Sequence, residues 1–216
     1  WLGVYGVGDV TNQIRLLQPE IVIYDALDTS RLDVEELRKV GIIVVSFEDL
    51  GGGAHHTNLT VNELFDKPQF QGSHILWGHE NFFLRDEFET AQPHGFKAEV
   101  DGIMLTFGGT DQHDLSRTIF RTISSFCKEQ GITIHIVTGP GYGGYDNLEA
   151  EVVADEGVYL THASGIISSI MKQTQLAITS NGRTVYEFAH MNIPSIVIAQ
   201  HDREFTHAFA TEENGF

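Results

Sequence analysis

The sequence predicts an α/β fold with two Rossmann-like domains. Apolar runs that end in acidic or glycine-bearing turns alternate with helix-compatible segments over residues 19–64, and again from residue 102 onward. Between residues 89 and 99 this alternation lapses into a Pro- and Gly-containing stretch that is typical of a linker. We therefore predict a first domain at 1–92 and a second domain at 96–216.

The sequence pattern of the first domain begins with a predicted βαβ unit. Residues 19–24 form an apolar run typical of a buried strand, residues 33–40 favour a helix that Gly41 ends, and residues 42–47 form the next strand. Such a unit implies a parallel sheet, so the glycine run at 51–54 becomes a flexible loop at its carboxyl edge.

Few strands are available to this first domain. Residues 59–64 favour one further short strand or a turn, and any earlier strands would lie upstream of Trp1. We therefore expect an incomplete first domain with fewer strands than the second.

The second domain restarts the β/α pattern. Residues 102–107 favour a strand, and Asp114 is the expected N-cap of an amphipathic helix that Gly131 ends. The pattern then continues to the carboxyl terminus through segments at 132–137, 149–154, 158–160, 166–173, 176–179, 183–190 and 193–199.

Composition excludes several classes of protein. The 216 residues carry 13 Lys+Arg against 30 Asp+Glu, a formal charge of −17, which argues against binding to nucleic acid or anionic membranes. No apolar run approaches the ~20 residues of a membrane span. The single Cys127 excludes an internal disulfide, suits the cytoplasm and lies on the apolar face of a predicted helix, where it would serve packing. The eleven His residues form no compact ligand pattern, so we expect no metal, and we expect no cofactor.

One strand–turn–helix stretch, residues 176–190, suggests a binding site. Its turn contains Ser180 and Gly182, and free backbone N–H groups at such a turn attract phosphate. Glu187, one turn into the helix, is placed to accept hydrogen bonds from a ribose. The alternative is purely structural, because every parallel α/β protein contains turns of this kind.

Several strings carry a family resemblance that covers most of the chain. They are residues 19–25, a strand ending in Asp; 47–50, with an acidic pair; 78–88, with Gly, aromatic, Leu-Arg and Glu-Phe elements; 107–111; and 180–187 with Pro194 beyond it. The chain resembles the UDP-sugar hydrolase family of pseudaminic-acid and spore-coat polysaccharide biosynthesis, which has a GT-B fold. The related transferase that adds N-acetylglucosamine to lipid II shares the second half more loosely.

The resemblance implies a UDP-sugar site in the second domain. Glu187 would take the ribose hydroxyls, and Ile167 would lie near the base. The residues expected to approach the phosphates are Gly108, Gly109, Thr110, Ser180, Asn181, Gly182 and Thr184.

The chain also departs from the family. The family's His-bearing turn, thought to supply the general base, has no counterpart, because Gly6-Val7-Gly8-Asp9 lacks the His. Asp202-Arg203 replaces an Asn-Gln pair that would address the sugar. The chain therefore resembles a family member truncated at the amino terminus and inactive by itself. The remaining candidates for a catalytic base are His55, His56 and His201.

Three functions remain open from the sequence. The first is hydrolysis of a UDP-sugar, and the second is glycosyl transfer from the same donor to a hydroxyl acceptor. The third is a binding module without chemistry of its own, attached to or associated with a sugar-activating synthase domain.

Overall fold

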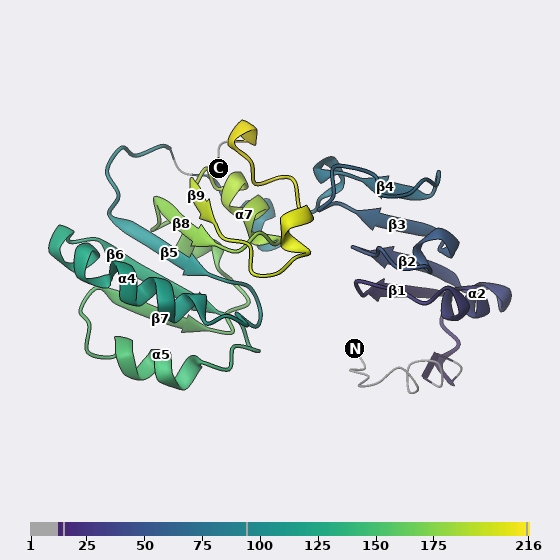
Figure 1. Cartoon of the computed structure of the whole chain (residues 1–216), viewed down its shortest axis with the longest axis horizontal. Coiled ribbons are helices and arrows are strands. Elements are labelled where there is room, and N and C mark those ends of the chain that lie inside the picture. Colours follow the sequence, from purple (N-terminus) through teal and green to yellow (C-terminus); the bar gives the residue numbers. More distant parts are fainter. Residues whose placement is uncertain (1–12, 15, 94, 215) are drawn as a thin grey trace. The chain divides into compact units, whose positions relative to one another are not determined.

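The computed structural model describes residues 13, 14, 16–93, 95–214 and 216. The chain divides into two compact units, Trp1–Phe82 and Phe83–Phe216, and each has its own sheet (Figure 1). The turn at Gly6-Val7-Gly8-Asp9 lies outside the described residues.

The first unit contains a parallel sheet of four strands in the order β1-β2-β3-β4. Helix α2 connects β1 to β2, which confirms the predicted βαβ unit. Val34 and Leu37 of α2 pack with Val44 of β2 in a small core. The elements are β1 (Ile21–Asp25), α2 (Arg31–Lys39), β2 (Ile43–Phe47), η1 (Ala54–His56), β3 (Leu59–Asn62), β4 (Ile75–Trp77) and η2 (His79–Asn81).

The glycine run after β2 is packed rather than open. The buried Asp49 carboxylate accepts hydrogen bonds from the backbone N–H of Thr29 (3.0 Å) and of Gly51 (2.9 Å). A Cβ on Gly51 would lie 2.4 Å from the backbone nitrogen of Thr29. Glycine is required here because two backbone segments approach closely. The prediction of a flexible loop is therefore wrong.

The second unit contains a parallel sheet of five strands in the order β7-β6-β5-β8-β9. In the described residues the first sheet thus has four strands and the second has five, as expected. The elements are α3 (Glu87–Thr90), β5 (Gly102–Thr106), α4 (Leu115–Gln130), β6 (Thr133–Thr138), α5 (Tyr145–Val152), β7 (Val158–His162), α6 (Ser168–Met171), β8 (Leu176–Thr179), α7 (Thr184–His190) and β9 (Ser195–Val197).

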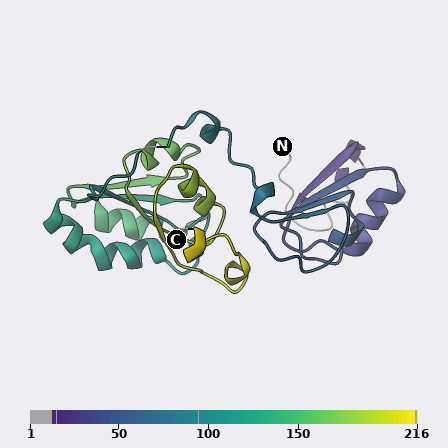
Figure 2. The ribbon, with the colours of Figure 1, turned by 90° about the horizontal axis from the view of Figure 1, so that it is seen from above.

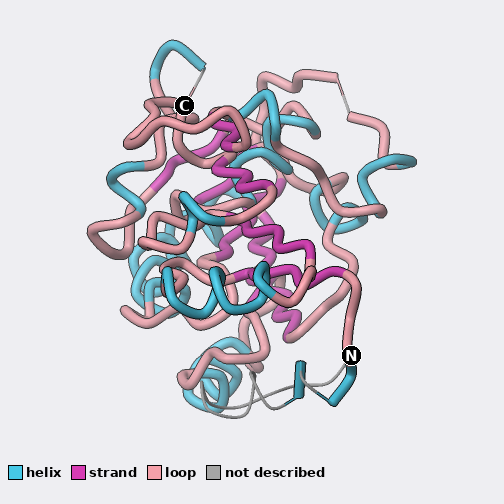
Figure 3. Tube along the Cα trace, turned by 90° about the vertical axis from the view of Figure 1, so that its right-hand side faces the viewer, coloured by secondary structure: helices cyan, strands magenta, loops and turns pink. Residues whose placement is uncertain are grey.

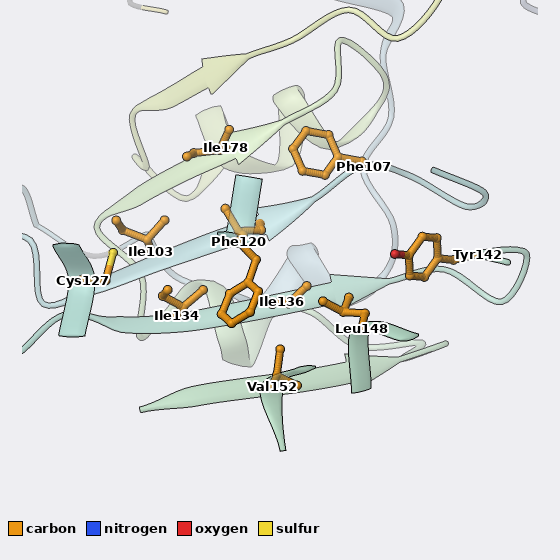
Figure 4. Close-up of a cluster of buried hydrophobic side chains, with 11 residues drawn as sticks. Ile103, Phe107, Phe120, Cys127, Ile134, Ile136, Tyr142, Leu148, Val152 and Ile178 are labelled. Atoms are coloured by element: carbon orange, nitrogen blue, oxygen red, sulfur yellow. The ribbon is translucent and has the colours of Figure 1, made fainter. Parts of the chain in front are cut away.

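Helices cover both faces of this second sheet (Figure 2). One face packs against α4 and α5, and Figure 4 shows Phe120 of α4 directed toward Ile134 and Ile136 of β6. The other face packs against α6 and α7 through Met171 and Phe188. Cys127 is 1% exposed and belongs to the first of these cores, which confirms its packing role.

The segment before the predicted linker belongs to the second unit. Phe88 and Ala91 are buried in the same cluster as Met104 of β5 and Phe188 of α7. The division of the chain therefore falls between Phe82 and Phe83, ahead of the expected boundary at residues 93–95. The sequence pattern missed this because α3 spans only four residues, which is too short to produce a helical pattern of apolar residues.

Asp114 occupies the N-cap position of helix α4, as expected, but the side-chain capping hydrogen bonds come from Asp111. Asp111 accepts hydrogen bonds from the backbone N–H groups of Leu115 and Ser116, both at 2.8 Å. Asp114 makes no side-chain cap and instead pairs with Arg117. Asp111 takes this role because the turn after β5 brings its carboxylate under the first free amides of the helix.

Beyond β9 the chain runs mostly as loop, with two short 3₁₀ turns, η3 (Glu204–Thr206) and η4 (Glu212–Asn214) (Figure 3). Within the described part of the chain, no helix has both the length and the apolar character to cross a membrane.

Candidate functional site

The strand order places a topological switch point between β5 and β8. From β5 the chain proceeds outward through β6 and β7, and then crosses to β8 and β9 on the opposite side. In open parallel sheets, ligands bind outside the carboxyl ends of the strands at such a point. The turns that leave β5 and β8 are those of Gly108 and of Ser180.

These two turns converge on the Ser180 hydroxyl. A Cβ built on Gly108 and one built on Gly182 would each meet the Ser180 Oγ first, at 3.9 Å. Gly108 adopts φ +74°, a conformation that favours glycine, whereas a Cβ on Gly109 would meet nothing within 4 Å. Within the described residues, the backbone N–H groups of Gly109 and Gly182 donate no hydrogen bond. The switch point therefore presents free donors beside open space.

The third glycine turn, after β6, has a structural explanation. A Cβ on Gly139 would lie 2.4 Å from the Cα of Gly109, and the Gly141 N–H donates to the Gly109 carbonyl at 3.0 Å. Glycine at 139 allows the two turns to touch through their backbones. It therefore supports the Gly108–Gly109 turn instead of offering space to a ligand.

Asn181 does not offer its donors to a phosphate in this structure. Its backbone N–H donates to the Glu204 carboxylate at 3.3 Å, and its side-chain amide donates to the carbonyls of Glu204 (2.8 Å) and His207 (3.2 Å). Glu204 is 6% exposed and also accepts from the Gln200 N–H at 2.7 Å. The backbone N–H of Asn181, which the family resemblance assigned to a phosphate, is thus bound to an internal carboxylate.

Glu187 is buried and is engaged by Arg85. It is 5% exposed, and its Oε1 accepts a hydrogen bond from the Arg85 Nε at 2.7 Å. Burial raises the pKa of Glu187 above its ordinary value, while the hydrogen bond and charge of Arg85 act in the opposite direction. The sequence pattern missed Arg85 because 102 residues separate it from its partner.

Ile167 lies in the core and not at an open surface. It is 6% exposed within the cluster formed by α6 and α7, and its backbone N–H donates to the Glu87 carboxylate at 3.0 Å. This placement does not support the expected contact of Ile167 with a base. The single-sequence pattern located the start of α6 but gave no information on which way its first side chain points.

The three candidate bases are held in different surroundings. In the first unit, His55 packs its ring against Phe70 at 4.3 Å, and the His56 Nδ1 lies 3.4 Å from Glu35. In the second unit, the half-exposed His201 lies 3.7 Å from Glu204. Each of the three rings therefore has a neighbouring side chain, and a catalytic role for any of them stays a prediction.

One group of metal-type ligands does form among the described residues, although the sequence predicted none. Ligand atoms of Asp66, His79 and Glu80 lie within 4.8 Å of one another. Asp66 already accepts hydrogen bonds from the backbone N–H and the ring of His79, at 3.0 and 2.9 Å. Asp66 lies in the loop between β3 and β4, whereas His79 and Glu80 lie in η2 after β4, so no short spacing in the sequence reveals the group.

The loop after β9 predicts a pH dependence of stability. Burial lowers the pKa of His207, although the Asn181 carbonyl that its Nδ1 contacts at 2.5 Å and the nearby Glu204 carboxylate act the other way. The folded chain therefore keeps His207 neutral to a lower pH than the unfolded chain, which binds a proton near the ordinary histidine pKa of about 6.5. We expect stability to fall as the pH drops below about 6.5.

The measurement is the melting temperature between pH 5 and 8. A His207→Gln variant should show a shallower loss on the acid side than the wild type. His135, whose pKa burial also lowers, keeps part of the slope in that variant. His113→Gln is the control for the loss of a histidine as such, because His113 is exposed. Equal slopes for the His207 variant and the wild type would contradict the assignment.

Sequence comparison gives one distant relative. No protein-family model matches the chain. An uncharacterized protein of Methanocaldococcus jannaschii, MJ1062, is 23% identical over 210 residues, which are 90% of this chain. The chain spans 43% of the length of that relative.

Solved structures give the fold. The UDP-GlcNAc 2-epimerase from Neisseria meningitidis bound to UDP-GlcNAc matches with a TM-score of 0.61 and 11% identity over 90% of this chain and 63% of its own. The spinosyn rhamnosyltransferase SpnG matches with a TM-score of 0.57 and 13% identity, over 94% of this chain and 59% of its own. Acinetobacter baumannii MurG matches with a TM-score of 0.52 and 14% identity, over 95% of this chain and 64% of its own. The chain is therefore similar to GT-B glycosyltransferases and epimerases, and its fold is an α/β fold of GT-B-like type.

Proposed function

We propose that this chain binds a UDP-sugar at the carboxyl edge of its second sheet and serves glycosyl transfer from that donor. The observation that carries the proposal is the convergence of the Gly108–Gly109 and Ser180–Gly182 turns, with free N–H groups at Gly109 and Gly182. Such donors stabilise a diphosphate both in the bound sugar nucleotide and as it departs. Because the protein is acidic overall, backbone donors of this kind would have to supply most of the attraction.

One of the similar structures supports the choice of ligand, and another supports the reaction. The Neisseria epimerase structure contains UDP-GlcNAc, and SpnG is a rhamnosyltransferase. In our proposal Gly108, Gly109 and Thr110 approach the diphosphate from one turn, and Ser180, Gly182 and Thr184 from the other. Glu187 receives the ribose.

UDP-sugar hydrolysis is the second candidate. It is favoured by the string at residues 78–88, which resembles the hydrolase family of pseudaminic-acid and spore-coat biosynthesis. The two reactions differ only in whether water or a hydroxyl acceptor attacks the sugar. Incubating the protein with a UDP-sugar, with and without a panel of sugar acceptors, and identifying the sugar product separates them.

The longer relative leaves room for an associated domain. The chain matches only 43% of MJ1062, so association with a sugar-activating synthase domain stays part of the proposal. A binding module without chemistry would then bind UDP-sugars and release no product from them.

Calorimetric titration with UDP, CMP and their sugars tests the proposal directly. We expect binding of UDP and UDP-sugars and none of the CMP compounds. Failure of every uridine nucleotide to bind would overturn it.

A glycine substitution ties binding to the proposed turn. Since a Cβ on Gly109 meets nothing within 4 Å, Gly109→Ala should leave the fold intact while holding the diphosphate away from the N–H groups. We expect UDP affinity to fall by about tenfold or more, equal to about 1.4 kcal/mol. Gly143→Ala is the matched control, because its Cβ is equally unobstructed in a neighbouring loop. Unchanged affinity in Gly109→Ala would remove this turn from the site.

A further inference from the structure

We infer that Arg85 is a positioning residue that orients the buried Glu187 carboxylate for the ribose hydroxyls of a uridine nucleotide. This inference rests on the proposed function for its ligand. Arg85 belongs to none of the glycine turns and stands outside the nucleotide-binding pattern of the sequence.

The Arg85 guanidinium joins two carboxylates from different elements. Its Nε donates to the Glu187 Oε1 at 2.7 Å, and its Nη2 lies 3.1 Å from the Glu87 Oε1. A planar guanidinium with several fixed donors holds two such acceptors in one orientation, which a flexible ammonium group does less well. The Glu187 side chain is 7% exposed whereas that of Arg85 is 45% exposed, so the pair reaches from a buried acceptor to the surface.

Glu87 is itself fixed, and this anchors Arg85. The Glu87 Oε2 accepts from the backbone N–H groups of Ile167 (3.0 Å) and Ser168 (2.8 Å), which begin α6. Hydrogen bonds and ion pairs thus connect the start of α6 to Glu87, Glu87 to Arg85, and Arg85 to Glu187 of α7. In the described part of the protein, Arg85 is the one donor to the Glu187 carboxylate, and it takes only Oε1. The second oxygen is left for a ligand.

The electrostatic consequence concerns the protonation of Glu187. Burial raises its pKa, and the Arg85 hydrogen bond and charge lower it; Glu87 raises it and Arg183 lowers it more weakly. Without Arg85 the carboxyl group would keep its proton to a higher pH. A protonated carboxyl accepts hydroxyl hydrogen bonds less strongly than a carboxylate does. Loss of Arg85 should therefore make nucleotide binding depend on pH.

The test is calorimetric titration of UDP from about pH 5.5 to 8 with wild type, R85Q and R85K. Affinity ratios to wild type cancel the titration of UDP itself. We expect the R85Q ratio to fall with decreasing pH, by up to about tenfold per pH unit below the raised pKa of Glu187. R85K keeps a cation, so its ratio should depend much less on pH. R121Q is the matched control, because Arg121 pairs with Glu151 (Nε to Oε2, 2.8 Å) between α4 and α5.

A ligand-free measurement keeps the inference separate from the proposed function. The carboxyl carbon of Glu187, followed by NMR against pH, should titrate at higher pH in R85Q than in wild type. An unshifted titration, or an R85Q affinity ratio that stays flat with pH, overturns the role of Arg85. If wild type binds no UDP, the proposed function and the ribose assignment fall together, while the NMR titration still decides whether Arg85 controls Glu187.

Discussion

We expect Glu187→Gln to bind UDP about ten- to a hundredfold more weakly than the wild type, with little change in the melting temperature of the free protein. A carboxylate that accepts two ribose hydroxyls makes charge-assisted hydrogen bonds of about 1.5–3 kcal/mol each. Glutamine keeps the size of the side chain and one carbonyl acceptor, to which the Arg85 Nε can still donate.

The structure also explains why the folded state should tolerate this change. Burial raises the pKa of Glu187, so the folded chain releases its proton at a higher pH than the unfolded chain. Stability contributed by this group therefore falls as the pH rises through that window, and a neutral Gln removes the cost. Its partner Arg85 is 45% exposed and remains solvated when the charge is lost.

Calorimetry with UDP and thermal unfolding without ligand measure the two effects. Glu151→Gln is the control, since it breaks an Arg–Glu pair of the same unit at α4 and α5. Equal UDP affinity for wild type and Glu187→Gln, with lower stability in the variant, would mean that Glu187 serves only its pairing with Arg85.

A second large effect is expected from Phe88→Ala. Phe88 is 1% exposed in the core formed by Met104, Phe188 and Met191, and its ring meets that of His190 edge-on at 6.0 Å. Truncating such a side chain removes buried apolar surface and leaves a cavity that the surrounding residues fill only in part. We expect a loss of about 3–5 kcal/mol in unfolding free energy.

Urea denaturation of Phe88→Ala and Phe96→Ala decides the matter. Phe96 lies eight positions further along and is 82% exposed, so its truncation should cost about 0.5 kcal/mol or less. A loss of unfolding free energy in Phe88→Ala as small as that in Phe96→Ala would show that the α3 segment is not part of the second unit's core. The same result would restore the boundary that the sequence pattern indicated.

The string at residues 78–88 carries the family resemblance most specifically, and its part beyond Phe82 has structural roles within the second unit. Leu84 packs against the core of Phe88, Arg85 holds Glu187, and Glu87 caps α6. A motif that looks like an element of the first domain is thus the support of a helix pair in the second. The family resemblance drew attention to this string, but only the contacts in the structure show what its side chains do.

The sequence by itself determined the β/α order of this protein. Apolar runs and glycine stops are local signals, and they placed β1, β2, β5, β6, β8 and the helices α2, α4 and α7 within a few residues of their observed bounds. Because parallel strands end at one edge, the same signals also placed the turns of Gly108 and Ser180 near each other.

Only the tertiary structure decided which donors at that edge are free. The Asn181 N–H donates to Glu204, which lies 23 residues away in the sequence, and Arg85 donates to Glu187 across 102 residues. Gly139 allows a close backbone contact with Gly109. Such partners are chosen by the packing of segments that are remote in the chain. Periodicity and spacing report only on neighbours in sequence, so they could name the turn but not the residues that hold it.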